Sequence, residues 1–346
     1  MRITLLLPGL LWPARAFRDI SSDLPLPALA ALLGRGRIAV AGPGSTEAWL
    51  ANAFGMKGAW PAAALRLLGA GVDPGGGHWL CADPARIALT ASGMPLDDPD
   101  RLALTADECA ALRQALAPVF DEVPGGIVAT RPGHWHLRLP GPLNLGTTPL
   151  PAAIGQDAKH LLPSGADARP WRTRLNEAQI LLHRHPVNAA REAAGRPPAN
   201  TLWFWGEGAL SAPRTPPDPP WRSIAWNDPA APGLARFAAV GSGPAPETWA
   251  GLEARAGGKG PLLVVLEDLI GPRRGRDALA WSAALEGVED RWFAPLDAAL
   301  RAGRVAALNL VAPGDAGTLR LEAAPGDRWR FWRRPLPLAA LADRLR

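Results

Sequence analysis

The sequence has few cysteines and no long apolar run. Only Cys81 and Cys109 occur, far apart and without metal-ligand spacing, which excludes a disulfide-dense scaffold and suits a reducing compartment. No run reaches the roughly 18 apolar residues that a membrane span needs. The apolar start, residues 3–12, with A-R-A at 14–16 mimics a short signal peptide, but prolines interrupt it, so we favour a first buried strand. We therefore expect a cytoplasmic protein.

The composition also lacks the features that are typical of disordered chains. Hydrophobic residues make up 48% of the 346 residues and charged residues 20%, with 15 tryptophans, which is enough apolar surface for a packed core. The length favours two structural units. The net charge is +5, and almost all of the positive charge is arginine in a chain rich in alanine, glycine and proline. Such a bias is only weak support for an acidic partner.

The two ends of the chain show strand-then-helix patterning. Residues 3–7, 261–266 and 305–311 are continuous apolar runs typical of buried strands. The patterning favours helices over residues 27–33, 46–54 and 61–68 near the start, over 171–182, and over about 277–300 near the end. The ends therefore resemble two halves of one α/β sheet domain.

The middle of the chain differs in texture. Short strands are predicted at residues 79–82, 86–89 and 135–139, with a helix over 105–120. We expect a discontinuous core of residues 1–75 and 170–346, an inserted α+β cap of residues 76–150, and a connecting loop at 151–169. A second connection rich in proline covers residues 211–220.

The most informative segment is residues 185–208, HPVNAAREAAGRPPANTLWFWGEG. Pro186 can start a helix and Gly195 can end it. A strand over 201–205 is expected to stop at the following G-E-G, where glycines allow a ligand to approach the backbone closely. In an open α/β sheet, ligands bind beyond such strand ends.

The pattern H-P-x-N, R, G-x-x-P-A-N and W-x-W-G-x-G resembles the archaeal-type cofactor-independent phosphoglycerate mutases of the alkaline phosphatase superfamily. It resembles still more closely a bacterial group labelled phosphoglycerate mutase or RpfE-type regulatory protein. The similarity extends to A-D-P-x-x-I-x-L at residues 82–89 and to L-N-E-A-Q at 175–179. The resemblance implies an α/β fold, an alkaline-phosphatase-like three-layer core with an inserted smaller α+β cap.

Seven residues of this segment are candidate ligand contacts. They are His185, Asn188, Arg191, Asn200, Gly206, Glu207 and Gly208. Arg191 has the strongest case, because a guanidinium fork suits a phosphate or carboxylate. A structural hydrogen-bond network explains Asn188, Arg191 and Asn200 equally well, and packing alone could fix the glycines and tryptophans.

The sequence departs from the resembled mutases where their metal site would be. Those enzymes use two metal ions held by Asp and His and a serine nucleophile, with Asp-Gly after the first strand and D-x-x-G-H and D-H after late strands. Here the first strand ends in Pro8-Gly9, and all six histidines lie at or before His185. The ancestral metal site is therefore expected to be lost, and no cofactor is predicted.

Weaker candidates remain for an active enzyme. Glu267, Asp268 and Asp315 follow late strands and could hold Mg²⁺ or Mn²⁺, although ordinary turn carboxylates are favoured. Ser45 or Thr46 could be the nucleophile, although a helix N-cap is favoured.

Two further clusters invite chemical interpretations. His134 and His136 would share one face of a strand, but no third metal ligand is identifiable. The stretch 328–334, RWRFWRR, interleaves cations and aromatics as single-stranded nucleic-acid binders do. Alternation across an edge strand gives the same string, so nucleic acid is not a favoured partner.

These observations predict a degenerate, catalytically inactive phosphoglycerate mutase-like protein, a pseudoenzyme. It would bind a small anionic metabolite or a protein partner in a regulatory role. The alternative is an active metal-dependent 2,3-bisphosphoglycerate-independent phosphoglycerate mutase or phosphatase with rearranged ligands.

Overall fold

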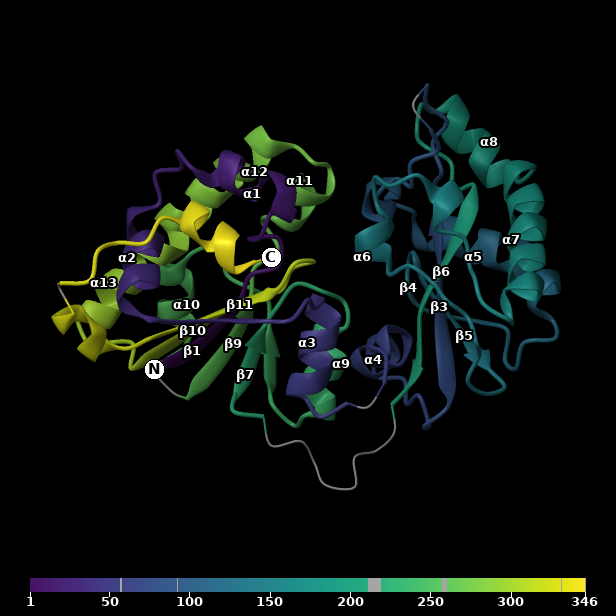
Figure 1. Ribbon diagram of the computed structural model, residues 1–346. Helices are drawn as coiled ribbons and strands as arrows, with labels where there is room; N and C mark the ends of the chain where they lie inside the picture. The colour runs from purple at the N-terminus through teal and green to yellow at the C-terminus, as the bar shows by residue number, and fades with distance from the viewer. Residues whose placement is uncertain (57, 92, 211–218, 257–259, 331, 346) are drawn as a thin grey trace. The chain divides into compact units, whose positions relative to one another are not determined.

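The structure, a computed structural model, describes residues 1–56, 58–91, 93–210, 219–256, 260–330 and 332–345 (Figure 1). The chain divides into two compact units, each with its own sheet. The first comprises Met1–Lys57, Pro217–Ala231 and Ala238–Arg346, and the second comprises Gly58–Pro216 and Pro232–Phe237. The predicted α/β class with a separate second sheet is confirmed. Most of the predicted connection at 211–220 lies outside the described residues. No described helix has both the length and the apolar character that crossing a membrane requires.

The first unit is built on a seven-stranded mixed sheet of order β2-β11-β10-β1-β9-β7-β8. Its strands are β1 (Arg2–Leu6), β2 (Arg37–Ala41), β7 (Ser223–Ala225), β8 (Gly241–Gly243), β9 (Pro261–Val265), β10 (Ala307–Ala312) and β11 (Thr318–Ala323). Strand β1 pairs in parallel with β9 and β10, whereas β11 runs antiparallel to β10 and β2. The continuous apolar runs predicted as strands thus lie at the sheet centre.

Helices cover one face of this sheet. They are α1 (Ala14–Ser21), α2 (Pro27–Arg35), α10 (Trp249–Ala256), α11 (Ile270–Arg274), α12 (Ala278–Val288) and α13 (Ala294–Arg301). Helix α3 (Thr46–Ala53) lies on the other face, where Trp49 packs against Trp221. The core packs α2, α12 and α13 against the sheet, as Figure 1 shows. The helix predicted over 277–300 is interrupted by a π-helical turn, η4 (Glu289–Phe293). The buried Glu289 carboxylate accepts the Ala28 and Leu29 amides at 2.5 and 3.1 Å and so caps α2.

The second unit is built on an antiparallel sheet of order β4-β5-β3-β6. Its strands are β3 (His78–Ala85), β4 (Ile127–Arg131), β5 (His134–Leu139) and β6 (Thr201–Ala209). Its helices are α4 (Ala62–Gly69), α5 (Ala106–Leu116), α6 (Leu150–Ala153), α7 (Ala168–His183), α8 (Pro186–Ala193) and α9, which begins at Ala231 and ends at Phe237. Its core gathers Trp135, Phe120, Phe204 and Trp171.

The boundaries differ from the expected cap of residues 76–150. The structure adds α4, α7, α8 and β6 to the second unit, because β6 pairs with β3 along its whole length. The prediction that the strand after Asn200 stops at Gly206 was wrong. Strand β6 runs on to Ala209, and Gly206 adopts φ +66° where the register with β3 shifts. Residues 86–89 form no strand, only a bridge between Ile87 and Leu96.

Short 3-10 segments complete the described structure. They are η1 (Pro99–Leu102), η2 (Ala117–Phe120), η3 (Ala158–His160), η5 (Pro325–Trp329) and η6 (Leu338–Arg344).

Candidate functional site

The carboxyl ends of the parallel strands β1, β7, β9 and β10 meet at one edge of the seven-stranded sheet, the usual ligand edge of an α/β sheet. A cavity of about 310 Å³ opens there. Its lining residues come from the segments after β7, β8 and β9 and from η4: Asn227, Ala245, Pro246, Glu247, Val265, Leu266, Glu267, Asp268 and Arg291. The structure therefore places Glu267 and Asp268 together in a cavity.

Glu267 has an unusual protonation equilibrium. Burial raises the pKa of Glu267 to about 7, although a hydrogen bond from Trp226 acts in the opposite direction. The neighbouring charge of Asp228 raises this pKa further and that of Arg274 lowers it. Near neutral pH the group can thus either donate or accept a hydrogen bond.

The raised pKa makes stability depend on pH. Glu267 holds its proton more tightly in the folded protein than in the unfolded chain, so the free energy of unfolding should fall as pH rises from about 4.5 to 7. In Glu267→Gln this fall should be smaller by about 2–3 kcal/mol, because the glutamine does not titrate. Urea unfolding at pH 5 and pH 8 measures it. The control is Glu177→Gln, at an exposed position of α7. Equal pH dependence in wild type and Glu267→Gln would contradict the prediction.

The other two carboxylates at this edge are paired with arginines. Asp268 lies 2.6 Å from Arg291, and Asp315 lies 2.6 Å from Arg273. The Arg273 Nε also donates to the Leu11 carbonyl at 2.7 Å. Within the described ranges, no group of three or more His, Cys, Asp or Glu side chains could hold a metal ion. A two-metal centre needs several such ligands, so these residues do not fit one.

The turn after β1 is closed by packing. Pro8 stands where the resembled mutases carry the Asp of their Asp-Gly. Gly9 has φ +86°, and a Cβ there would lie 2.7 Å from the Leu269 carbonyl oxygen. The Gly9 carbonyl accepts the Trp281 indole N–H at 2.8 Å. Contacts within the protein therefore fix this turn.

Ser45 and Thr46 lie at the same edge. The Gly44 amide donates to the Gly314 carbonyl at 3.2 Å, which brings the turn before α3 next to the turn before Asp315. The Ser45 hydroxyl accepts the Ala48 amide at 3.1 Å, as an N-cap does. The structure thus gives Ser45 the structural role that the sequence favoured.

The H-P-x-N segment lies in the second unit, in an antiparallel sheet region rather than at a parallel strand end. His185 is the N-cap of α8 and accepts the Val187 amide at 3.2 Å. The buried Asn188 amide donates to the Leu182 and Ala199 carbonyls and accepts the Ala199 amide, at 2.7–3.0 Å. These bonds connect the end of α7 to the start of β6.

Arg191 is completely buried and bonded on three sides. Its Nε donates to the Pro197 carbonyl at 2.9 Å, one terminal nitrogen to Glu108 at 2.8 Å, and the other to the Leu102 carbonyl. Burial opposes ionisation of Glu108, but the Thr105 amide and the charges of Arg191 and Arg196 hold its pKa below the usual value. For Arg191 the sequence allowed either a structural hydrogen-bond network or a ligand contact, and these bonds are of the structural kind.

Asn200 makes a matching pair of backbone bonds. Its side-chain oxygen accepts the Ile87 amide at 2.8 Å, and its nitrogen donates to the Ile87 carbonyl at 2.9 Å. The Asn200 side chain therefore makes the two backbone hydrogen bonds to Ile87 that a neighbouring strand would otherwise make.

Gly206 and Gly208, the two glycines of G-E-G, allow the start of helix α4 to pack closely against the sheet. A Cβ on Gly206 would lie 2.7 Å from the Ala62 Cβ, and one on Gly208 would lie 2.8 Å from the Pro61 Cβ. Glu207 pairs with His78, 3.1 Å between oxygen and nitrogen. The sequence suggested that a ligand approaches the backbone at these glycines. In the structure the start of α4 approaches them instead.

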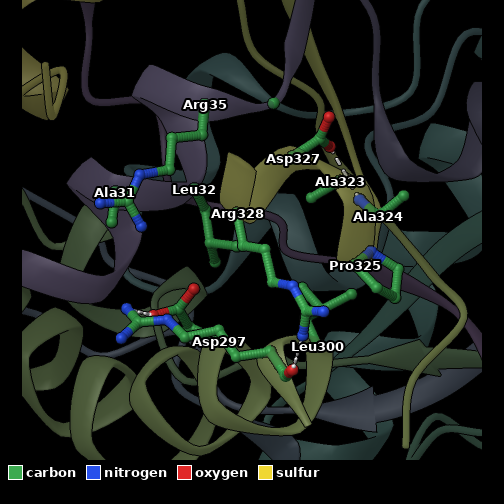
Figure 2. A pocket seen from close by; sticks show the side chains of 12 residues that line it. Ala31, Leu32, Arg35, Asp297, Leu300, Ala323, Ala324, Pro325, Asp327 and Arg328 are labelled. Atoms are coloured by element: carbon green, nitrogen blue, oxygen red, sulfur yellow. Dashed lines mark hydrogen bonds and ion pairs between the residues drawn. The ribbon is translucent and has the colours of Figure 1, made fainter. Parts of the chain in front are cut away.

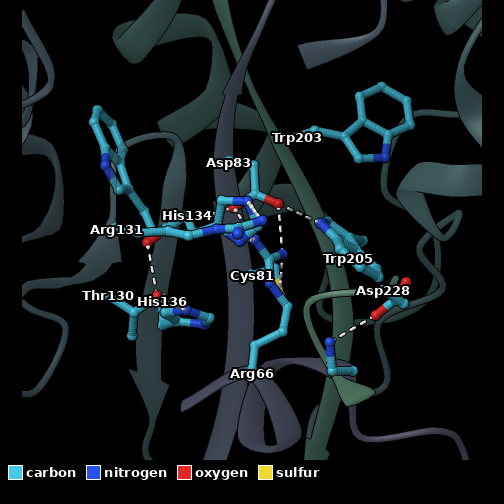
Figure 3. A network of polar contacts seen from close by, with 12 residues as sticks. Arg66, Cys81, Asp83, Thr130, Arg131, His134, His136, Trp203, Trp205 and Asp228 are labelled. Carbon is cyan, nitrogen blue, oxygen red and sulfur yellow. Dashed lines mark hydrogen bonds and ion pairs between the residues drawn. The ribbon is translucent and has the colours of Figure 1, made fainter. Parts of the chain in front are cut away.

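A buried polar network between α4 and the sheet was not expected from the sequence (Figure 3). Arg66 and Asp83 are 4% and 1% exposed and lie 2.7 Å apart. Asp83 also accepts the Trp135 amide at 3.1 Å and the Trp205 indole N–H at 2.9 Å. The signals in the sequence were Asp83 within a mostly apolar strand and Arg66 within a helix that is otherwise apolar.

His134 and His136 border this network. Arg66 donates to Nδ1 of His134, and burial together with the Arg66 charge lowers the pKa of both histidines to about 3. His136 is fully buried, with Nε2 at 3.2 Å from the Thr130 hydroxyl. Both imidazoles are therefore neutral hydrogen-bonding groups of the sheet.

The arginine-rich tail is not an edge strand, so that interpretation was wrong. Residues up to Trp329 form the 3-10 helix η5, and Phe331 lies outside the described residues. Arg328 donates to the Arg301 carbonyl at 2.7 Å and lies over the Trp329 ring, 4.8 Å from its centroid. With Arg35 it lines a small pocket of about 20 Å³, which Figure 2 shows.

No family model matches the chain. The 2,3-bisphosphoglycerate-independent phosphoglycerate mutase of Methanothrix thermoacetophila is 32% identical over 121 residues, 34% of this chain and 30% of that protein. The enzyme of the same name from Methanosarcina barkeri is 36% identical over 78 residues, 21% of this chain and 19% of its own length. The matched region thus spans less than a third of either relative.

A solved structure shares the fold. The PH0037 protein of Pyrococcus horikoshii superposes with a TM-score of 0.53 at 12% identity, over 98% of this chain and 91% of that one. A cofactor-independent phosphoglycerate mutase from Thermoplasma acidophilum gives a TM-score of 0.49 at 18% identity, over 94% and 90%. The sequence matches confirm the resemblance that the motifs indicated, and the chain is phosphoglycerate mutase-like.

Proposed function

We propose that this phosphoglycerate mutase-like protein binds a small anionic metabolite at the carboxyl edge of its seven-stranded sheet without converting it, in a regulatory role. The observation that carries the proposal is the pairing of Asp268 with Arg291 and of Asp315 with Arg273 at that edge. Guanidinium groups stand beside the carboxylates that would otherwise be free to hold a cation.

The Asp268–Arg291 pair can exchange partners. The two side chains are 34% and 42% exposed, and ion pairs this exposed contribute only about 0–1 kcal/mol. A phosphate or carboxylate entering the cavity can therefore replace Asp268 on the Arg291 fork at little cost. Protonated Glu267, in the same cavity, would donate a hydrogen bond to that anion.

The regulatory role and the cytoplasmic location belong to the same proposal. Cys81 and Cys109 are both buried and form no disulfide in the part of the chain that the structure describes, as suits a reducing compartment. Binding without turnover would let the protein report a metabolite concentration to a partner.

Calorimetric titration with 3-phosphoglycerate and 2-phosphoglycerate tests the proposal. We expect saturable binding that weakens about tenfold in Arg291→Gln, the loss of one charge-assisted contact. Binding should also weaken above pH 7, where Glu267 loses its proton. The matched control is Arg301→Gln, which removes an exposed arginine paired with Asp297 on α13.

Metal content by mass spectrometry and a coupled mutase assay accompany the titration. We expect no stoichiometric metal and no turnover. One or two Mg²⁺ or Mn²⁺ ions per chain with turnover would overturn the proposal and restore the active mutase or phosphatase. Absence of binding to either phosphoglycerate would instead favour a protein partner.

A further inference from the structure

One face of the seven-stranded sheet is polar over β1, β10 and β11. Pairing places Thr4, Asn309 and Glu322 in one row across β1, β10 and β11. Arg320 pairs with Val311 two rows along and points to the same face, as alternate strand residues do. The opposite face carries the intervening apolar residues, which belong to the main core. A polar face is common for antiparallel strands, but β1 and β10 also pair in parallel, and parallel strands are normally covered on both faces.

An aromatic wall covers part of this polar face. The Trp221 indole N–H donates to the Thr4 hydroxyl at 2.8 Å, which holds the ring on β1. Trp221 also packs against Trp49 and Phe54 at the α3 end, with ring centroids 5.8 and 5.4 Å apart. These three packed rings therefore form an aromatic wall along one side of the polar face.

Beside this wall lies a cavity of about 510 Å³. It is lined by backbone and side chains of β1, β10 and β11, by Trp49 and Asn52 of α3, and by Trp221. Concave sites of roughly 300–1,000 Å³ with aromatic walls and a few polar groups are typical of small-molecule sites. The residues that begin β1, β9 and β10 also line it, so it lies away from the carboxyl edge described above.

The charge of the cavity is positive. Glu322 is paired with Arg37 at 2.7 Å and is thereby neutralised. Among the residues that the structure describes, neither Arg2 nor Arg320 forms an ion pair. The cavity lining therefore presents two cations, Arg2 and Arg320. It also presents the amides of Asn52 and Asn309 and the half-buried ring of Trp49.

We propose that this cavity binds a small molecule in which a planar aromatic ring carries an anionic group. The ring stacks on Trp49, since aromatic faces favour offset stacking. The phosphate or carboxylate is held by Arg320 and Arg2, whose planar forks suit such groups. The amides of Asn52 and Asn309 supply donors and acceptors for polar edges of the ring.

Calorimetric titration of the full chain tests the proposal with four probes: AMP, indole-3-acetate, adenosine and inorganic phosphate. We expect saturable binding of AMP or of indole-3-acetate, and whichever binds identifies the anionic group as phosphate or carboxylate. Adenosine and inorganic phosphate should each bind at least tenfold more weakly than whichever of AMP and indole-3-acetate binds, because each lacks half of the recognised chemistry.

Two variants locate the site. Arg320→Gln, at an exposed strand position, should weaken binding about tenfold, and Trp49→Leu should weaken it by a similar factor. The controls are Arg255→Gln, an exposed arginine of α10, and Trp329→Leu, an exposed tryptophan of η5. Arg291→Gln should leave this binding unchanged, which separates it from the phosphoglycerate site.

Three results would overturn the proposal. The first is no saturable binding of AMP or indole-3-acetate. The second is inorganic phosphate binding as tightly as AMP, which would remove the aromatic component. The third is binding that survives both Arg320→Gln and Trp49→Leu.

Discussion

Replacing Arg66 with methionine should lower the free energy of unfolding of the second unit by about 3–5 kcal/mol. The substitution leaves the Asp83 carboxylate buried, with hydrogen bonds from the Trp135 amide and the Trp205 indole but no positive partner. It also removes the donor to His134. Urea unfolding, with hydrogen exchange of the β3 and β5 amides, measures the loss.

Arg86→Met is the matched control. Arg86 pairs with Asp97 in the same unit at 2.6 Å, but both side chains are about one-third exposed. Its loss should cost about 0–1 kcal/mol. The double variant Arg66→Met with Asp83→Leu should recover only part of the stability, because it removes the unpaired buried charge but leaves the Trp135 amide and the Trp205 indole N–H without their acceptor. Arg66→Met no more damaging than Arg86→Met would contradict the assignment.

Arg191→Met should lower the stability of the second unit by about 3 kcal/mol. The substitution leaves the buried Leu102 and Pro197 carbonyls without their donor and takes one cation from Glu108. Thermal unfolding and hydrogen exchange of α5 and α8 measure the loss.

Arg196→Met separates burial from charge, because Arg196 pairs with the same Glu108 at 2.9 Å but is half exposed. It should cost less than about 1 kcal/mol. If Arg191→Met kept its stability and instead abolished binding of an anion, the ligand role predicted for Arg191 would replace the structural one.

Local patterns in the sequence predicted the elements that are fixed by local physics. Continuous apolar runs identified β1, β9 and β10, and Pro and Gly near the ends identified α2, α3 and α8. The pairing of β6 with β3 was missed because it depends on contacts between segments more than a hundred residues apart, which no local pattern records. The G-E-G glycines suggested a ligand because sequence cannot say which backbone approaches them.

The candidate site shows the same division. The absence of histidine after His185 is visible in the sequence. The pairing of Asp268 with Arg291 and of Asp315 with Arg273 is not, because each pair joins residues more than twenty positions apart. The raised pKa of Glu267 likewise depends on burial that only the folded sheet creates.

The position of β1 has a consequence for the order of folding. This strand is synthesised long before β9 and β10, yet it lies between them in the sheet. The second unit is nearly continuous and can complete its sheet while the first still lacks its centre. Until β9 and β10 have been synthesised, β1 is an apolar strand with two unpaired edges, an arrangement that favours aggregation of the incomplete first unit.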